Sequence, residues 1–377
     1  MNDANAPVRL IGRRRLLQLS GAGIALSTLG FGTGGAFAAD PTIRWVSPRG
    51  TLEVVDDFGY WVAKKYGYFG DLQTDIQAGP LDGTATVKLV DQKQSDFGYP
   101  SPGIFSLGLN QGMDLVSVFD VMASDVFDFA FQKGKAPSDL KGLEGKTILL
   151  GSAGWQAITD PMLAAAGVDI KSVKYVDAGN GWAQSLAQGQ GDTALSWEGL
   201  RAQWRGQGLG FDYLLGKHVS KFPANSYVAR KSDLADPAKV ALYGKYLRGW
   251  AMGMEFGLQN PRAATQIMME QFPALSSQMN PSVATDSLMQ ELQLMHGRWD
   301  ERKAWGFHIM PSWQSYFDSI AAIGQVSKVF KAEDVCTNQF VTAANDFDHA
   351  KVKADADGFK LSSDYAAVDV AAIQAAL

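Results

Sequence analysis

Strand-like and helix-like segments alternate along the chain from residue 42 onward, and this alternation restricts the fold more than any other feature of the sequence. Residues 42–47 and 72–77 are typical of strands, and between them apolar residues from Val55 to Tyr66 recur at helical spacing. A further helix-like segment at 84–94 leads to a short strand at 95–99. Strands and helices that alternate so closely form parallel sheets, because parallel neighbours need a crossover connection. The sequence therefore predicts the α/β class.

The same alternation starts again near residue 147. An apolar strand at 147–150 is followed by helix-like segments and by strands at 173–176 and 193–197. After Pro223 the pattern changes, and residues 238–258 read as one long helix. We therefore predict two α/β lobes, each with a parallel-type sheet and flanking helices.

The boundaries of the lobes follow from where the pattern stops and restarts. Lobe I is predicted to comprise residues 40–130 together with 226–345, and lobe II residues 133–224. The chain would cross between the lobes twice, through segments near 126–132 and 225–230, which makes a hinge with a cleft. Two independent α/β domains in series remain an alternative. Residues 346–377, charged and rich in Ala, are predicted to form a peripheral C-terminal tail.

The first 38 residues have the three parts of an export signal. Arg13, Arg14 and Arg15 precede a short apolar stretch, and Ala36-Phe37-Ala38 forms a small-x-small cleavage site. The arginine run is also similar to a twin-arginine signal. We predict export to the periplasm with cleavage near Ala38; the alternative is a basic N-terminus on a cytosolic protein. Export argues against most chemistry driven by ATP or nicotinamide.

Charge and cysteine content exclude several classes of function. The whole chain has a net charge of −5. Removal of the signal, with Arg9, Arg13, Arg14 and Arg15 against Asp3, leaves −5 − 3 = −8, which argues against nucleic acid as a partner. A single cysteine allows no intramolecular disulfide, and the four histidines are scattered. We therefore predict no metal site and no cofactor.

Five short motifs, in chain order, resemble a known family. They are residues 60–69 (YWVAKKYGYF), 95–98 (SDFG), 143–147 (LEGKT), 187–192 (AQGQGD) and 260–264 (NPRAA). Together they are similar to periplasmic solute-binding proteins of the branch that serves ABC importers of nitrate, sulfonates, taurine and thiamine-precursor pyrimidines. The resemblance implies a bilobal fold with two crossover segments and a ligand bound between the lobes. It also implies an ABC permease and a cytoplasmic ATPase as partners, and no enzymatic activity.

Two predicted loops of lobe I carry candidate ligand-binding residues. Arg49, in the loop after the first strand, is suited to a forked contact with a carboxylate or sulfonate, and Thr51 follows it. Tyr99 and Ser101 flank a Pro-rich turn, where the tyrosine could stack on a ring and the serine could donate a hydrogen bond. The alternatives are a solvated arginine and a turn that only caps a helix.

Lobe II contributes the other candidates. Ser152 and Trp155 lie in a Gly- and Ser-containing loop between a strand and a helix, a junction suited to an anion held by backbone amides. Trp197 and Glu198 end the last strand of this lobe, and the preceding unit adds two more candidates, Asn180 and Trp182. Glu198 could accept a hydrogen bond from a ligand amine or simply begin a helix, and Trp182 could instead be a core residue.

These residues predict an aromatic-walled pocket with a few polar groups. An aromatic or heterocyclic carboxylate or sulfonate is the predicted ligand. A pyrimidine-like thiamine precursor held by Glu198 or Glu53 is the alternative. A binding lobe that feeds a sensor is a further alternative, and an exported hydrolase is disfavoured because no motif supplies a nucleophile–base pair.

Overall fold

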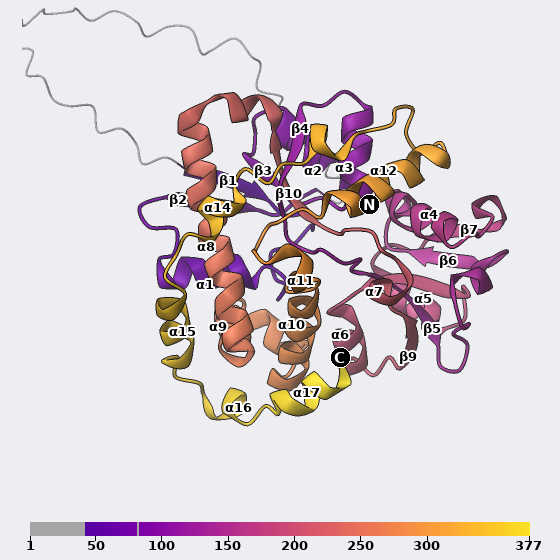
Figure 1. The fold of residues 1–377 in the computed structure, drawn as a ribbon. Coiled ribbons are helices and arrows are strands. Elements are labelled where there is room, and N and C mark those ends of the chain that lie inside the picture. Colours follow the sequence, from indigo (N-terminus) through magenta and orange to yellow (C-terminus); the bar gives the residue numbers. More distant parts are fainter. Residues whose placement is uncertain (1–41, 81–82) are drawn as a thin grey trace, which may run out of the picture. The chain divides into compact units, whose positions relative to one another are not determined.

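Two five-stranded sheets form the framework of the computed structural model, which describes residues 42–80 and 83–377 (Figure 1). The predicted export signal lies outside the described residues. The first sheet has the strand order β2-β1-β3-β10-β4, and the second has the order β7-β6-β8-β5-β9. The strands are β1 (Thr42–Val46), β2 (Gln73–Gln77), β3 (Phe97–Gly98), β4 (Leu115–Asp120), β5 (Phe127–Gln132), β6 (Thr147–Leu150), β7 (Lys174–Asp177), β8 (Thr193–Trp197), β9 (Phe211–Leu214) and β10 (Ser226–Arg230).

Helices connect the strands and pack against both sheets, so the predicted α/β class is confirmed. In the first part of the chain they are α1 (Phe58–Tyr66), α2 (Gly83–Asp91), α3 (Pro102–Asn110), α4 (Gln156–Ala165), α5 (Trp182–Ala187), α6 (Leu200–Gly206) and α7 (Gly216–Val219). After β10 they are α8 (Pro237–Gln259), α9 (Pro261–Gln271), α10 (Pro281–Met295), α11 (Trp299–Arg302), α12 (Met310–Ala322), α13 (Ala332–Val335), α14 (Val341–Asn345), α15 (His349–Asp357), α16 (Ser363–Ala366) and α17 (Val370–Ala376).

Each sheet is mixed, which refines the prediction of parallel-type sheets. β1 runs parallel to β2 and β3, and β6 runs parallel to β7 and β8. The exceptions are the two strands by which the chain changes sheets. β5 follows β4 in sequence yet pairs antiparallel with β8 and β9, and β10 returns to pair antiparallel with β3 and β4. A strand that arrives from the other sheet has no crossover helix to impose the parallel direction.

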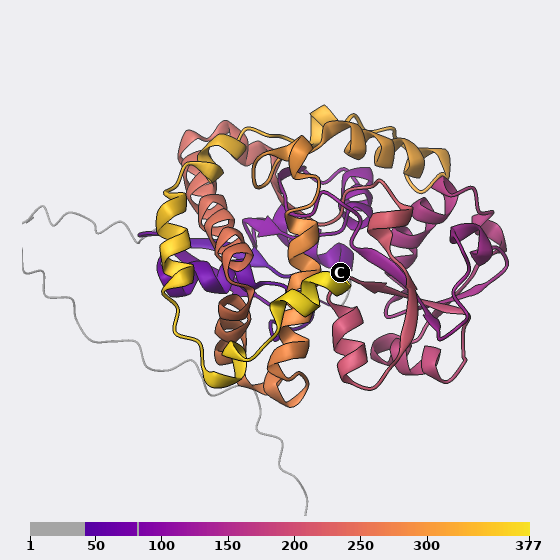
Figure 2. The ribbon, with the colours of Figure 1, turned by 60° about the horizontal axis from the view of Figure 1, so that its bottom comes forward.

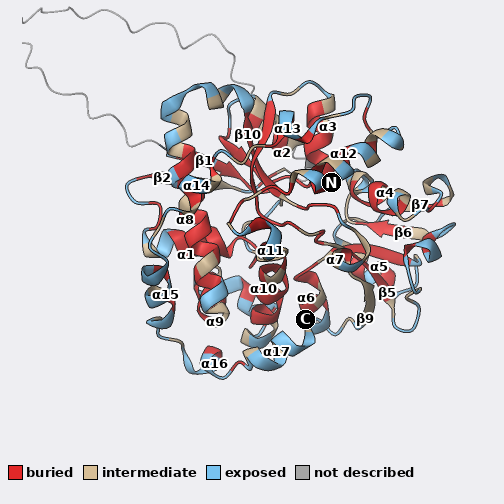
Figure 3. Ribbon diagram, viewed as in Figure 1, coloured by how far each residue is buried: buried red, intermediate tan, exposed pale blue. Residues whose placement is uncertain are grey.

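The largest core lies where the long helix α8 crosses α1 beside the first sheet. Trp45, Tyr60 and Trp250 are fully buried there, and their rings pack at centroid distances of 5.6–6.5 Å. The helices come so close that a Cβ atom on Gly253 would lie 1.9 Å from the carbonyl oxygen of Gly59. Figure 3 shows the burial concentrated in the sheets and in the inner faces of α1, α8 and α10.

The C-terminal helices run along the outside of the α8–α10 layer. α15 packs on α8, α16 on α9 and α17 on α10 (Figure 2). Val352 and Ala356 of α15 are fully buried, and Tyr365 of α16 is 8% exposed. The main-chain oxygen of Leu377 accepts a hydrogen bond from Lys217 Nζ at 3.1 Å.

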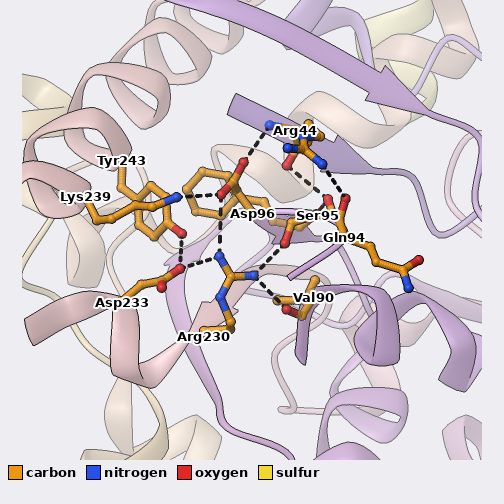
Figure 4. Close-up of polar contacts among 10 residues, drawn as sticks. Arg44, Val90, Gln94, Ser95, Asp96, Arg230, Asp233, Lys239 and Tyr243 are labelled. Carbon is orange, nitrogen blue, oxygen red and sulfur yellow. Dashed lines mark hydrogen bonds and ion pairs between the residues drawn. The ribbon is translucent and has the colours of Figure 1, made fainter. Parts of the chain in front are cut away.

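A buried arginine fixes the end of β10 to the neighbouring elements (Figure 4). Arg230, 4% exposed, donates from Nη1 to the carbonyl oxygens of Val90 and Ser95 at 2.7 and 2.6 Å. Its Nη2 pairs with Asp233 at 2.5 Å and with Asp96 at 3.5 Å. These contacts join β10, α2 and the loop before β3, so they determine where the returning strand ends.

The strand order creates two positions where loops diverge at the carboxyl edges of the sheets. β1 lies between β2 and β3, and β6 lies between β7 and β8, so in each sheet the chain connects from β1 or β6 first to a strand on one side and then to a strand on the other. Ligands of open α/β sheets bind at such positions. The loops after β1, β3, β6 and β8 are therefore the place to look for a site.

Candidate functional site

A cavity of about 150 Å³ lies among these loops, and residues from both parts of the fold line it. The first sheet contributes the loops after β1 and β3, and the second contributes the loop after β6 and the end of β8. Six of the predicted site residues line the cavity: Arg49, Tyr99, Ser101, Ser152, Trp155 and Trp197. The loops that follow these strands thus bring together residues more than 140 positions apart in the sequence.

Four predicted residues are not part of the cavity lining. Thr51 and Asn180 are exposed, and the Thr51 hydroxyl accepts a hydrogen bond from the Glu53 amide at 3.0 Å. Trp182 lies behind the wall, stacked on Trp197, and donates from Nε1 to the Leu195 carbonyl oxygen at 2.8 Å. Glu198 is fully buried in ion pairs.

Glu198 is held by cations of this chain rather than left available for a ligand. Its Oε2 pairs with Arg201 at 2.6 Å, and its Oε1 pairs with Lys217 at 3.2 Å. Both partners are largely buried, so the charge of Glu198 is compensated within the protein. Glu53, the other acid considered for a pyrimidine-like ligand, is exposed.

Tryptophan rings form the wall on the side of the second sheet. Trp155 and Trp197 meet edge-to-face at 5.7 Å and 85°, and Trp182 supports both from behind. The chain needs a glycine just before this loop, because a Cβ atom on Gly151 would lie 2.6 Å from the Trp155 ring. The result is a rigid apolar surface against which a flat ring could pack.

Tyr99 and Ser101 shape the opposite wall. Tyr99 stacks on Tyr227 at 5.3 Å and 28°, and its carbonyl oxygen accepts a hydrogen bond from Asn225. Burial and the nearby Glu291 carboxylate raise the pKa of the Tyr99 phenol well above its usual value. Ser101 caps α3, since its Oγ accepts a hydrogen bond from the Ile104 amide. The serine therefore has the capping role considered as its alternative, and it also faces the cavity.

Arg49 lines the cavity but already has two carboxylate partners. Its Nη2 lies 2.8 Å from Asp56 Oδ2, and its Nη1 lies 3.0 Å from Asp57 Oδ1. Burial alone would lower the pKa of Arg49, but Asp56 and Asp57 outweigh it and raise that pKa. Burial raises the pKa of Asp57 to about 6 despite the attraction of Arg49. The guanidinium is fully charged and largely neutralised within the protein.

The acid that lines the cavity is Glu291, which is not among the residues predicted from the sequence. It lies on α10, 1% exposed, between Gln290 and Leu292 in a run of buried residues. Among the described residues, its Oε2 has no hydrogen-bond partner. Burial and the neighbouring Asp56 carboxylate raise its pKa well above the usual value. Glu291 shares the buried face of α10 with a second acid, Asp286, so the sequence pattern did not single it out.

The structure also brings together a serine, a histidine and an asparagine that no sequence motif connects. Ser117 Oγ lies 2.7 Å from His308 Nε2, and His308 Nδ1 lies 3.0 Å from Asn338 Oδ1. Ser117 and His308 are fully buried, and burial lowers the pKa of His308 to about 3. None of the three lines the cavity. The group therefore ties β4 to the loops after α11 and α13 and gives no support to a hydrolase.

A family model described as "NMT1/THI5 like" matches residues 56–264, more than half of the chain. The chain belongs to the NMT1/THI5-like family. The matched region contains five of the six predicted residues that line the cavity; Arg49 lies before it. A search of curated protein sequences gave no significant match.

Solved structures confirm the fold of this NMT1/THI5-like protein as the periplasmic-binding-protein fold. The alkanesulfonate-binding protein SsuA from Xanthomonas axonopodis pv. citri, bound to MOPS, has a TM-score of 0.60 at 12% identity, covering 80% of this chain and all of that one. The nitrate-binding protein NrtA from Synechocystis PCC 6803 has a TM-score of 0.58 at 12% identity, covering 85% and 99%. The aliphatic sulphonate-binding protein SsuA from Escherichia coli has a TM-score of 0.56 at 14% identity, covering 79% and 97%.

No helix within residues 42–80 and 83–377 is both long and apolar enough to cross a membrane. Within the same residues, no group of three or more histidine, cysteine or acidic side chains is arranged to hold a metal ion.

Proposed function

We propose that this protein is the substrate-binding component of an ABC importer. The observation that carries the proposal is the cavity at the carboxyl edges of both sheets, lined by Arg49 and Tyr99 from one side and by Trp155 and Trp197 from the other. Membership of the family and the shared fold support it. The protein would hold a small solute without making or breaking a bond.

Capture of the solute would involve a hinge between two lobes. We propose the boundaries drawn from the sequence, with lobe I at residues 40–130 and 226–345 and lobe II at 133–224. The change of sheet at β5 and the return at β10 support a division into two lobes, although β5 (Phe127–Gln132) pairs within the second sheet and so begins lobe II a few residues earlier than proposed. A solute that contacts both lobes would shift the population towards the closed arrangement.

The partners would be an ABC permease and its cytoplasmic ATPase. Proteins of this fold that belong to import systems support that assignment, among them the ligand-binding component of an ABC-type import system from Staphylococcus aureus, with a TM-score of 0.57 at 12% identity. The predicted export signal would place the protein on the periplasmic side, where the closed form would meet the permease.

The ligand is proposed to be a small organic molecule with a flat ring. The tryptophan wall and Tyr99 would enclose the ring, as aromatic side chains do in many small-molecule sites. An organic carboxylate or sulfonate would need Arg49, which Asp56 and Asp57 already hold. An anionic ligand stays a prediction, but the ion pairs of Arg49 favour the alternative ligand, a pyrimidine-like heterocycle. Its acid partner would be Glu291 in place of Glu198 or Glu53.

A thermal-shift screen, followed by calorimetry on any hit, tests the proposal. The panel contains aromatic carboxylates, sulfonates, taurine, nitrate and aminopyrimidines. We expect a ring compound to raise Tm and to remain chemically unchanged after prolonged incubation. Trp155→Ala should weaken its binding about tenfold or more, whereas Trp155→Phe, which keeps an aromatic face, should retain most of the affinity. Turnover of the compound, or equal affinity in Trp155→Ala, would contradict the proposed function or the proposed wall, respectively.

A further inference from the structure

Beside the cavity, buried acids outnumber the buried bases. Three carboxylates, those of Asp56, Asp57 and Glu291, surround the single guanidinium of Arg49. Asp56 and Asp57 are 5% and 0% exposed, and Glu291 is 1% exposed, so water screens them little. Buried acids in excess of their cations are costly unless something else supplies positive charge or a proton.

The neighbouring group of charged residues around Glu198 does not supply the missing positive charge. Glu198 also acts on Glu291, but Arg201 and Lys217 hold it, and the nearby Asp128 carboxylate is attracted by Arg201. With the buried Asp125, which also acts on Asp128, that group has three acids and two bases, but none of these five residues lines the cavity. Of the two groups, only the one formed by Arg49, Asp56, Asp57 and Glu291 contributes residues to the cavity lining.

Two carboxylate oxygens in this group have no partner among the described residues. They are Asp57 Oδ2 and Glu291 Oε2, and the hydroxyl of Tyr99 next to them also has none. Buried polar atoms are normally paired, and unpaired ones mark positions where a ligand or water completes the network. Glu291 and Tyr99 both line the cavity, so a bound solute can reach them.

The remaining surface of the cavity suits a cation as well. Trp155, Trp197 and Tyr99 present aromatic rings, whose faces attract positive charge. A buried acid next to aromatic faces is a combination that recognises protonated amines and amidines, because the carboxylate supplies charge and the rings supply contact area without competing donors.

We propose that the solute carries a single positive charge on a nitrogen that reaches Glu291, and that Glu291 selects cations over neutral and anionic analogues. This inference rests on the proposed function, since it identifies the ligand class of the same cavity. Tyr99 would accept a second hydrogen bond from the same nitrogen. Arg49, held by Asp56 and Asp57, would position those acids rather than contact the solute.

The test uses three probes that share one ring and differ in charge: benzamidine, benzamide and benzoate. Calorimetry on the purified full chain at pH 8 should show benzamidine binding at least about tenfold more tightly than benzamide, with benzoate weakest, because a close charge pair contributes more than 1.4 kcal/mol. Equal or tighter binding of benzoate overturns this inference while the proposed function stands. If none of the three probes nor the screening panel binds, the proposed function fails as well.

Glu291→Gln separates selection by charge from a merely structural role. The variant keeps the shape of the side chain, so we expect the benzamidine preference to fall about tenfold or more while affinity for benzamide changes less than about threefold. Glu333→Gln, an exposed acid on α13, is the matched control and should behave as the unmodified chain. Equal losses for both probes overturn the assignment to Glu291. If Glu291→Gln does not fold, the preference measured on the unmodified chain still decides the charge of the solute.

Discussion

Arg230 shows how one side chain can fix the place where the chain returns to the first sheet. Its guanidinium joins two carbonyl oxygens to two carboxylates, and all of these groups lie within the buried ends of neighbouring elements (Figure 4). The network is mostly enclosed, so its contribution to stability depends on every member being present.

We expect Arg230→Met to lower the free energy of unfolding by about 3–5 kcal/mol, because removal of one partner leaves buried acids and carbonyls unpaired. Urea unfolding followed by fluorescence measures the change. Arg44→Met is the control: that side chain is exposed and bonds only weakly to Gln94, so its loss should change stability by less than about 1 kcal/mol. Similar effects of the two substitutions would show that the network adds no stability.

The residues of the candidate site could be predicted from the sequence where they follow or end a strand. They could not be predicted where an element distant in the sequence brings them to the cavity. Arg49, Tyr99, Ser152 and Trp197 follow or end strands, and the carboxyl edge of a sheet is where such residues gather. Glu291 belongs to a helix that reads as core, and only the packing of α10 against α6 brings it to the cavity. Local pattern contains no information on that contact.

At the level of elements, the close crossing of α1 and α8 depends on glycine. Gly253 faces the backbone of Gly59 without room for a methyl group, whereas Gly244, on the same helix, has Ala343 Cβ at 3.5 Å as its nearest neighbour. Gly244 and Gly253 therefore have opposite expected responses to the same substitution.

We expect Gly253→Ala to lower the free energy of unfolding by at least about 1–3 kcal/mol, because the helices must separate to admit the new methyl group. Gly244→Ala should be neutral or stabilising by up to about 1 kcal/mol, since alanine favours a helix and meets only ordinary contact. Thermal unfolding of both variants gives the comparison. Equal Tm values for the two would mean that the crossing tolerates a side chain at residue 253.

Element type followed from the sequence more readily than strand direction. The alternation of segments predicted β1, β2, β3, β6, β7 and β8 within a few residues. It did not show that β5 and β10 run antiparallel to their neighbours, nor that residues 211–214 form the edge strand β9. Direction depends on which sheet a strand joins, and that is decided by contacts far apart in the sequence.

At the scale of the whole molecule, α6 and α10 form a polar seam beside the cavity. Arg205 pairs with Asp286, Gln203 Nε2 donates to Ser287 Oγ at 3.0 Å, and the Gly199 amide donates to Gln290 Oε1 at 2.9 Å. α6 follows a strand of the second sheet, and α10 packs on α8 and α9, so the seam spans the two proposed lobes.

The seam should favour the closed arrangement even without solute. Asp286→Ala combined with Gln290→Ala removes two of its contacts without touching the cavity lining. We expect the free double variant to have a larger radius of gyration by small-angle scattering and to bind the best screening hit several-fold more weakly, because binding must then supply the cost of closure. At saturating solute its radius of gyration should return to that of the unmodified protein. Weaker binding with an unchanged radius of gyration would mean that the seam acts on the site directly and that no hinge connects them.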